Sequence, residues 1–175
     1  MLNRRDVLIS SARACAALAL APRFAAAQQS GAVITRPIPK TGEQLPMVGL
    51  GSSATFSEAA GNDDVAAISE VFTTMLENGG TVFDTAPSYG ASEEVAARAV
   101  RQVGASDRVF WATKLNVARR ASTADPAAAR AQVEQSFELL GRETIDLSQV
   151  HNIADMPTQF PILEEYKAPG PVRYI

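Results

Sequence analysis

Hydrophobic positions along residues 34–175 recur at two spacings, one typical of amphipathic helices and one typical of short strands. Helical spacing predicts four helices, at about 62–78, 92–103, 126–140 and 158–166. Short apolar runs between them predict strands at 81–83, 109–113, 145–150 and 172–175. Because strands and helices alternate, the pattern indicates βαβ units around a parallel sheet.

Several residues mark where these helices begin and end. Asn62 and Ser92 stand at the start of the first two helices and are predicted to cap them, and Asp125 is predicted to begin the third. Gly141 is predicted to end the third helix. Val103, at the end of the second helix, is expected to point inward.

Residues 34–51 predict a β-hairpin followed by a buried strand. Lys40–Glu43 has the composition of a turn, and the apolar run 47–51 is expected to be the buried strand. Two parallel-sheet folds remain open at this point, a closed barrel and an open doubly wound sheet. An open sheet of the dinucleotide-binding type would carry the motif G-x-G-x-x-G at its first turn. Residues 49–54 have the first two glycines of this motif and an alanine in place of the third.

Three chemically useful side chains stand at the ends of three successive predicted strands: Asp84, Lys114 and His151. Tyr89 follows in the loop after Asp84, close enough in sequence to fold back over the same strand ends. In a parallel barrel, all carboxyl ends of the strands meet on one face, and that face holds the active site. This placement favours the barrel over the open sheet.

Each of these residues also has an ordinary structural explanation. Taken alone, Asp84 could be a turn residue, and Lys114 could be a solvated residue at a strand end. Tyr89 alone could anchor its loop by packing its ring. His151, the single histidine of the chain, alone fits a buried, hydrogen-bonded imidazole. Because all four are expected on one rim, they favour a common site.

These four residue types together suit the reduction of a carbonyl group. A tyrosine donates a proton to the developing alkoxide, but its ordinary pKa is about 10. A neighbouring lysine ammonium favours the phenolate form of a tyrosine, and an aspartate keeps that lysine charged and oriented. A histidine hydrogen bond polarises the carbonyl oxygen. The hydride has to come from a nicotinamide cofactor.

The motifs that carry these residues resemble those of the aldo-keto reductase family. The stretch from Phe83 to Glu93 (FDTAPSYGASE) is similar to the family signature, and 111–114 (WATK) and 145–152 (IDLSQVHN) are similar to its next two motifs. Residues 36–51 resemble the family's N-terminal hairpin and first barrel strand.

This resemblance implies a (β/α)₈ barrel of the TIM type and an NADPH-dependent aldehyde or ketone reductase, with NADH as the alternative cofactor. It implies Tyr89 as the general acid, Asp84 and Lys114 as its tuning pair, and His151 as the residue that orients the substrate. The residues that approach the cofactor would be Gly51, Ser52, Asp84 and Asn152. The implied partner is a small-molecule carbonyl substrate.

The length of the chain sets a further expectation. A complete barrel of this type takes about 250 residues, and the sequence has 175. We therefore expect the first four βα units and the start of a fifth strand, as an incomplete and inactive piece of a longer enzyme. Two alternatives are a half-barrel that self-associates to cover its open edges and a non-catalytic remnant.

The first 27 residues have the features of an export signal. Arg4 and Arg5 precede an apolar stretch at 7–21, interrupted by Arg13, and small residues at 25–27 suit a signal-peptidase site. The alternative is a disordered or amphipathic N-terminal helix. Twin arginines predict export to the periplasm in a folded state, with the Sec route as the alternative and no membrane anchor after cleavage. Residues 28–33 would be a short leader before the barrel at 34–175.

Charge and cysteine content narrow the partners. Without residues 1–27, 12 lysines and arginines accompany 18 aspartates and glutamates, a net charge of −6. Such a surface predicts no nucleic-acid partner. Cys15, the single cysteine, lies in the predicted signal, so the mature chain is expected to have neither a disulfide nor a thiolate metal site.

Overall fold

The structure, a computed structural model, describes residues 33–61, 65–118, 123–167 and 170–175. All of them except Val33 belong to one unit, Ile34–Ile175. The predicted signal peptide at 1–27, most of the predicted leader and the predicted cap Asn62 lie outside the described residues. The expectations about export and about that cap therefore stay predictions.

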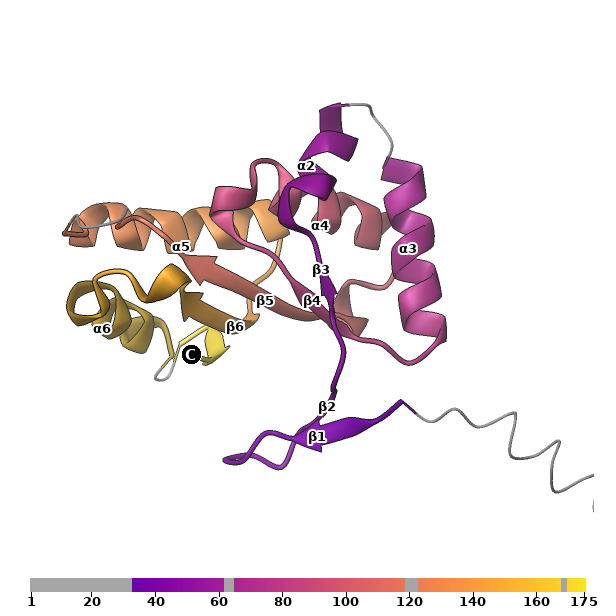
Figure 1. Cartoon of the computed structure of the whole chain (residues 1–175), viewed down its shortest axis with the longest axis horizontal. Helices are drawn as coiled ribbons and strands as arrows, with labels where there is room; N and C mark the ends of the chain where they lie inside the picture. Colours follow the sequence, from indigo (N-terminus) through magenta and orange to yellow (C-terminus); the bar gives the residue numbers. More distant parts are fainter. Residues whose placement is uncertain (1–32, 62–64, 119–122, 168–169) are drawn as a thin grey trace, which may run out of the picture. The chain divides into compact units, whose positions relative to one another are not determined.

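The described residues form an antiparallel hairpin and a five-stranded parallel sheet (Figure 1). The hairpin strands are β1 (Thr35–Pro37) and β2 (Gln44–Pro46). The parallel strands are β3 (Leu50–Gly51), β4 (Val82–Asp84), β5 (Phe110–Leu115), β6 (Ile145–Val150) and β7 (Val172–Tyr174). They lie side by side in sequence order. A doubly wound sheet reverses its strand order at a switch point, so the sequential order excludes it and confirms the barrel type.

At least one helix follows each of the first four parallel strands. The α-helices are α2 (Ser53–Gly61), α3 (Val65–Glu77), α4 (Ser92–Gln102), α5 (Pro126–Leu140) and α6 (Met156–Lys167). Short 3₁₀ helices lie at η1 (Pro87–Tyr89), η2 (Ser106–Arg108) and η3 (His151–Ile153). The sequence pattern does not predict α2, because Phe56 is its single large apolar residue.

The helix α5 forms as predicted because both of its ends are capped. Asp125 accepts a hydrogen bond at 3.0 Å from the backbone N–H of Ala127, which satisfies one unpaired donor of the first turn. Gly141 ends the helix at φ 62° and ψ 41°, a left-handed conformation that suits glycine. The strand β6 also has the predicted bounds.

Three local predictions are wrong. Met47 and Val48 are 54% and 80% exposed, and the expected buried strand shrinks to the two residues of β3, which pairs only with β4 in the described sheet. Ser92 is the first residue of α4 rather than its cap, because its hydroxyl accepts a hydrogen bond from Thr85. Val103 lies beyond the helix end and is 36% exposed, and Val100 takes the inward position.

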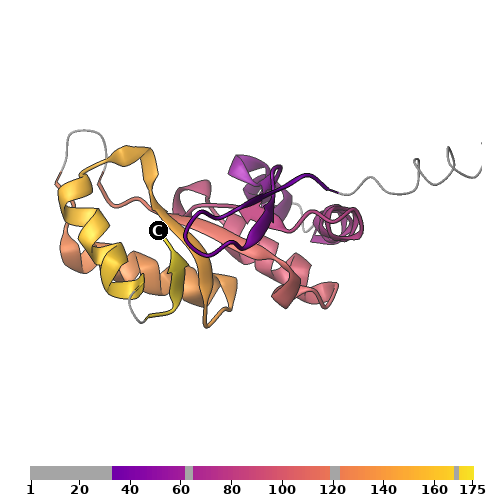
Figure 2. The same ribbon diagram turned by 90° about the horizontal axis from the view of Figure 1, so that it is seen from below.

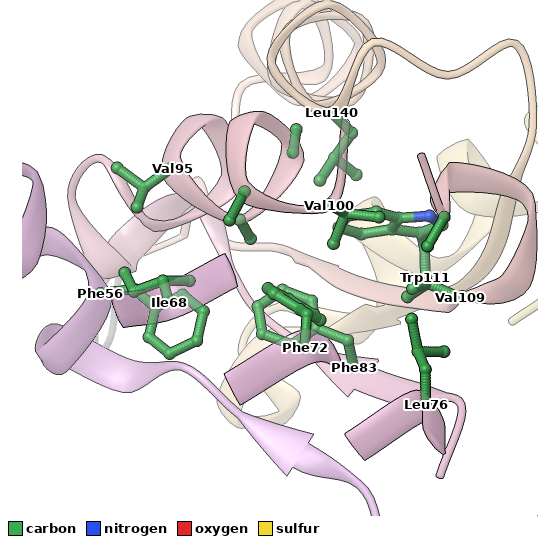
Figure 3. Packing of buried hydrophobic residues seen from close by; sticks show 14 of the residues in the cluster. Phe56, Ile68, Phe72, Leu76, Phe83, Val95, Val100, Val109, Trp111 and Leu140 are labelled. Carbon is green, nitrogen blue, oxygen red and sulfur yellow. The ribbon is translucent and has the colours of Figure 1, made fainter. Parts of the chain in front are cut away.

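The face of the sheet that is covered by helices carries the main hydrophobic core (Figure 3). Phe83 of β4 lies at its centre, with ring centroids 5.4 Å from Phe56, 5.0 Å from Phe72 and 5.6 Å from Trp111. These rings come from α2, α3 and two strands, so they join the first helices to the sheet. A second cluster packs α5 and α6 against the end of β5, and it contains Leu115, Ala129, Val133, Ile162 and Leu163.

The opposite face of the sheet borders a cavity. Val82 and Phe110 are paired in register and precede the core residues by one position in their strands, so they point to this face. With Leu147 they line a cavity of about 660 Å³ that also borders the hairpin and Tyr174. In a closed barrel this face is the interior, which is filled by layers of side chains from all the strands.

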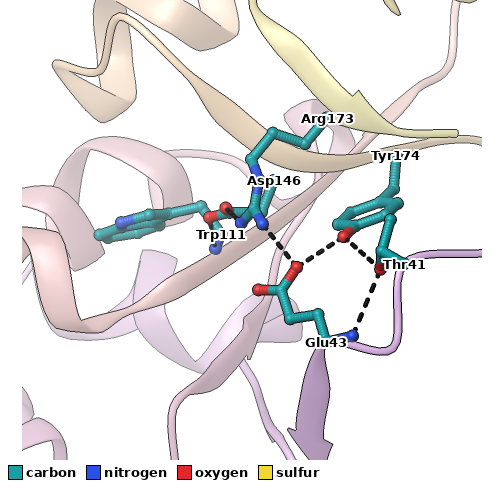
Figure 4. A network of polar contacts seen from close by, with 6 residues as sticks. All are labelled: Thr41, Glu43, Trp111, Asp146, Arg173 and Tyr174. Carbon is teal, nitrogen blue, oxygen red and sulfur yellow. Dashed lines mark hydrogen bonds and ion pairs between the residues drawn. The ribbon is translucent and has the colours of Figure 1, made fainter. Parts of the chain in front are cut away.

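A polar network ties the hairpin to the end of the sheet where the strands begin (Figure 4). Arg173 of β7 forms ion pairs with Asp146 of β6 and with Glu43 of the hairpin. The other carboxylate oxygen of Asp146 accepts the backbone N–H of Trp111 at 2.7 Å. Tyr174 donates a hydrogen bond to Glu43. Figure 2 shows the hairpin in front when the molecule is seen from below. This end is opposite to the strand ends that carry the predicted site.

Candidate active site

An ion pair between Lys114 and Asp84 forms the base of the predicted site. Asp84 ends β4 and pairs in register with Ala112 of β5, and Lys114 lies two residues further along β5 on the same face. The Lys114 Nζ lies 2.7 Å from Asp84 Oδ1 and donates a second hydrogen bond to the Thr85 carbonyl at 2.9 Å. The Lys114 side chain is 13% exposed and that of Asp84 41%. The ammonium is therefore held in a fixed direction at the strand ends.

Tyr89 is brought over this pair by the 3₁₀ turn η1. The backbone N–H of Tyr89 bonds to the Ala86 carbonyl at 3.0 Å, which turns the chain back toward the sheet. The Lys114 Nζ lies 5.2 Å from the centroid of the Tyr89 ring, within range of a cation–π interaction. Gly90 leaves the turn at φ 63°, and a methyl group there would collide with the Ser57 hydroxyl. The turn thus depends on glycine directly after Tyr89.

His151 also packs against the Tyr89 ring. It is the first residue after β6, and its ring meets Tyr89 edge to face, with centroids 5.7 Å apart and planes at 88°. Its Nδ1 is 3.2 Å from the Ser88 hydroxyl oxygen. Burial and the charge of Lys114 hold the pKa of His151 below its ordinary value, although Asp84 acts in the opposite direction. The structure therefore brings all four predicted catalytic side chains together.

The titration of His151 gives a direct check of this geometry. Because its pKa is lowered in the folded chain, folding favours the neutral ring, and this contribution to stability is lost as the pH falls through the ordinary histidine range. An NMR titration follows one residue, since the chain has one histidine. We expect a midpoint below about 6.5 and a higher midpoint in Lys114→Gln. A midpoint at or above the ordinary value would contradict the arrangement.

The residues expected near a cofactor lie in different environments. Gly51 pairs with Asp84 in register, and nothing lies within 4 Å of the position that a Cβ would take, so the space over it is open. Ser52 is buried, and its hydroxyl and backbone N–H both bond to the Asp84 carbonyl. Asn152 is exposed in a left-handed conformation at φ 56°. Gly51, Ser52 and Asp84 are therefore neighbours in the structure. Asn152 lies apart from them in sequence, on the loop that begins with His151.

Two residues that contact the site or the strand behind it are not predicted by the sequence. Ser88 contacts His151 across 63 residues of chain, and its only sequence signal is its position beside Tyr89. Glu93 is 1% exposed and accepts a hydrogen bond at 2.6 Å from Thr113, the neighbour of Lys114. Burial raises the pKa of Glu93, and the Thr113 bond opposes that rise. Glu93 stands three residues before Ala96 and seven residues before Val100. This helical spacing indicates that Glu93 lies on the buried face of α4.

The described residues offer neither a metal-binding cluster nor a membrane-spanning helix. Among residues 33–61, 65–118, 123–167 and 170–175, no three histidine, cysteine, aspartate or glutamate side chains gather in a group suited to a metal ion. No helix in this described part is long and apolar enough to cross a membrane.

Comparison with known proteins places this fold and these motifs in one family. The sequence profile of the aldo/keto reductase family matches residues 47–175, which include all four catalytic candidates. The chain therefore belongs to the aldo/keto reductase family of oxidoreductases, whose members typically depend on NADPH.

Individual relatives support the family and the fold, and each is considerably longer than the matched region. Aldo-keto reductase YhdN of Bacillus subtilis (strain 168) is 35% identical over 120 residues, which are 65% of this chain and 36% of that protein. A crystal structure of an aldo/keto reductase from Brucella melitensis is 26% identical, with a TM-score of 0.59 over 81% of this chain and 52% of its own.

A second solved structure, the aldo-keto reductase AKR11C1 from Bacillus halodurans in its holo form, has a TM-score of 0.61. It is 22% identical and supports the fold alone, over 81% of this chain and 49% of its own. This chain thus spans about half the length of the two solved structures and about a third of YhdN. The fold is that of part of an aldo-keto reductase barrel.

Proposed function

We propose that these residues carry the catalytic group of an NAD(P)H-dependent aldehyde or ketone reductase. One observation carries the proposal: the ammonium of the 2.7 Å Lys114–Asp84 ion pair lies 5.2 Å from the centre of the Tyr89 ring, and His151 packs edge to face against the same ring. All four side chains come from the carboxyl ends of parallel strands or from the loops after them, where barrel enzymes hold their active sites.

In this proposal, Tyr89 donates its phenolic proton to the oxygen of the carbonyl as the negative charge develops there. Lys114 places its positive charge 5.2 Å from the centre of the Tyr89 ring, close to where negative charge develops in the proposed reaction. Asp84 and the Thr85 carbonyl hold the ammonium in place through two short hydrogen bonds. His151 donates a hydrogen bond to the same carbonyl oxygen and so orients the substrate. A nicotinamide cofactor, when bound, supplies the hydride.

The described residues fit the reactive end of such a cofactor. The open space over Gly51 and the partly exposed carboxylate of Asp84 lie beside the catalytic group. Barrel enzymes commonly hold phosphate on loops after the seventh and eighth strands, and the described sheet has five parallel strands. We therefore propose that this chain supplies the catalytic group and the nicotinamide end of the site, with tight NADPH or NADH binding requiring the rest of a barrel.

A chimeric barrel tests the proposed reductase. Residues 34–175 would be joined to the part of YhdN that follows its matching region, which completes the barrel with strands from a relative. We expect this chimera to oxidise NADPH in the presence of 4-nitrobenzaldehyde, and the 175-residue chain by itself to show no such activity. Turnover by the 175-residue chain would refute the proposal that the rest of a barrel is needed. A folded chimera that binds NADPH without turnover would refute the proposal that this chain supplies the catalytic group.

A second proposal concerns the chain by itself, as a self-associating half-barrel without reductase activity. The observation that favours it is the apolar cavity of about 660 Å³ on the inner face, beside the open edge of β7. An uncovered strand edge is a template for pairing with another chain. Size-exclusion chromatography with light scattering is expected to show a dimer or larger species. A monomer at all concentrations would exclude self-association.

We further propose that residues 1–27 direct export, so that the remainder of the chain acts in the periplasm. The arginine pair Arg4-Arg5, the apolar stretch and the small residues at 25–27 support this assignment.

A further inference from the structure

The contact between Ser88 and His151 bears on which nitrogen of the imidazole carries the hydrogen. Ser88 Oγ lies 3.2 Å from His151 Nδ1, within hydrogen-bond distance. The serine belongs to the turn η1, one residue before Tyr89, and the histidine follows β6. In a neutral histidine, one ring nitrogen is a donor and the other an acceptor, and the bond made by one nitrogen fixes the state of the other.

The chemistry of the two groups favours one direction for this bond. A serine hydroxyl rotates freely and either donates or accepts. The lone pair of an sp² imidazole nitrogen is a better acceptor than a hydroxyl oxygen, so the O–H of Ser88 is expected to donate to Nδ1. The hydrogen of the neutral ring then stands on Nε2. Burial and, after it, the nearby charge of Lys114 disfavour the doubly protonated ring, in which both nitrogens would be donors.

The surroundings also fix the plane of the ring. Tyr89 packs against the imidazole at 88°, which limits rotation of His151 about its side-chain bonds. With Nδ1 bonded to Ser88, Nε2 is the nitrogen left to contact another group. A carbonyl oxygen at the site needs a donor, and only the tautomer with hydrogen on Nε2 offers one there while the ring stays neutral.

We propose that Ser88 is a positioning residue, which donates its hydroxyl hydrogen to Nδ1 of His151 and thereby fixes the tautomer that carries hydrogen on Nε2. The consequence for carbonyl orientation rests on the proposed reductase function. The tautomer of His151 does not depend on that function, so it can be measured without any turnover.

The test is a long-range ¹H–¹⁵N NMR measurement on the full 175-residue chain, in which the single histidine gives one set of ring signals. It is made about two pH units above the ordinary histidine pKa of about 6.5, where the ring is neutral. We expect Nδ1 of the unmodified chain to have the chemical shift of an unprotonated nitrogen and Nε2 that of a protonated one. Ser88→Ala is expected to move the two shifts toward each other, and Ser88→Thr to restore them.

Two more variants make the result decisive. Ser88→Asp places an acceptor-only carboxylate beside Nδ1, so it is expected to move the hydrogen to Nδ1 and invert the shifts. Thr123→Ala also removes a side-chain hydroxyl, at an exposed threonine in the loop before α5. It is the control for Ser88→Ala and is expected to leave the shifts unchanged.

Hydrogen on Nδ1 in the unmodified chain would overturn the proposal, and so would unchanged shifts in Ser88→Ala or an equal change in Thr123→Ala. These outcomes leave the reductase proposal standing. An inactive chimera that still shows hydrogen on Nε2 would instead refute the reductase proposal alone.

Discussion

Replacing Tyr89 with phenylalanine in the completed barrel is expected to lower the turnover of carbonyl reduction about 10²- to 10⁴-fold, the usual contribution of a general acid. The change removes one oxygen atom and keeps the ring, so the packing against His151 and the contact with the Lys114 ammonium remain. The affinity for NADPH should therefore stay within about a factor of two, because binding does not require the phenolic proton. Steady-state kinetics and fluorescence titration of NADPH measure the two quantities separately.

The matched control is Tyr166→Phe. Tyr166 lies on α6, where its hydroxyl donates to Glu134 of α5 at 2.7 Å, on the outer side of the sheet. This substitution removes the same atom and should leave turnover unchanged. Similar losses in both variants would point to a general effect on the fold, and full activity in Tyr89→Phe would exclude Tyr89 as the proton donor.

Replacing Trp111 with alanine is expected to lower the free energy of unfolding by about 3–5 kcal/mol, the usual cost of deleting a large buried aromatic side chain. Trp111 is 1% exposed, meets Phe83 edge to face at 5.6 Å, and donates its indole N–H to the Ser106 carbonyl at 3.2 Å. The deletion therefore leaves a cavity behind the strand that carries Lys114. Urea denaturation followed by far-UV circular dichroism measures the loss, because the change also removes the single tryptophan.

Two comparison variants separate the cavity from other effects. Trp111→Phe keeps most of the buried ring and loses the indole hydrogen bond, so its cost should be clearly smaller. Val71→Ala lies on α3 at a position that is 44% exposed, and its effect should stay within about 0.5 kcal/mol. A loss below about 1 kcal/mol in Trp111→Ala would contradict the central position of this residue in the core.

The sequence predicted those parts of the fold whose signals are local. The helix α5 and the strand β6 follow from a cap, a terminal glycine and a run of apolar residues, and the structure has them as expected. The predictions for Ser92 and Val48 are wrong because local residue type does not show the contacts of Ser92 or the exposure of Val48. The hydroxyl of Ser92 bonds to Thr85 of the preceding loop, and Val48 lies on the chain between the hairpin and an edge strand.

The candidate site shows the same division. Asp84, Lys114 and His151 were found because each stands at or beside the end of a strand, and the register of the sheet brings these ends together. Ser88 and Glu93 were not found, because their importance depends on contacts with His151 and Thr113 that only the folded chain creates. Residue type and strand position thus indicate the candidate catalytic side chains, whereas contacts such as those of Ser88 and Glu93 depend on packing.

The two ends of the sheet carry different kinds of contact. At the end where the strands begin, Arg173 and Asp146 join the hairpin to the sheet, and these contacts stabilise the fold. At the end where the strands finish, Lys114 and Asp84 form an ion pair beside an open space over Gly51. In barrels, the carboxyl end of the strands is the catalytic face and the other end contributes stability.

We propose above all that this chain carries the proton donor and the orienting residues of a carbonyl reductase. Tracing the transferred hydrogen in the chimeric barrel tests it most directly, with NADPH deuterated at the hydride position and 4-nitrobenzaldehyde as the acceptor. We expect an alcohol with deuterium on its carbinol carbon from the unmodified chimera, and at most a trace of it from Tyr89→Phe under the same conditions. A folded, NADPH-binding chimera that forms no deuterated alcohol would contradict the claim.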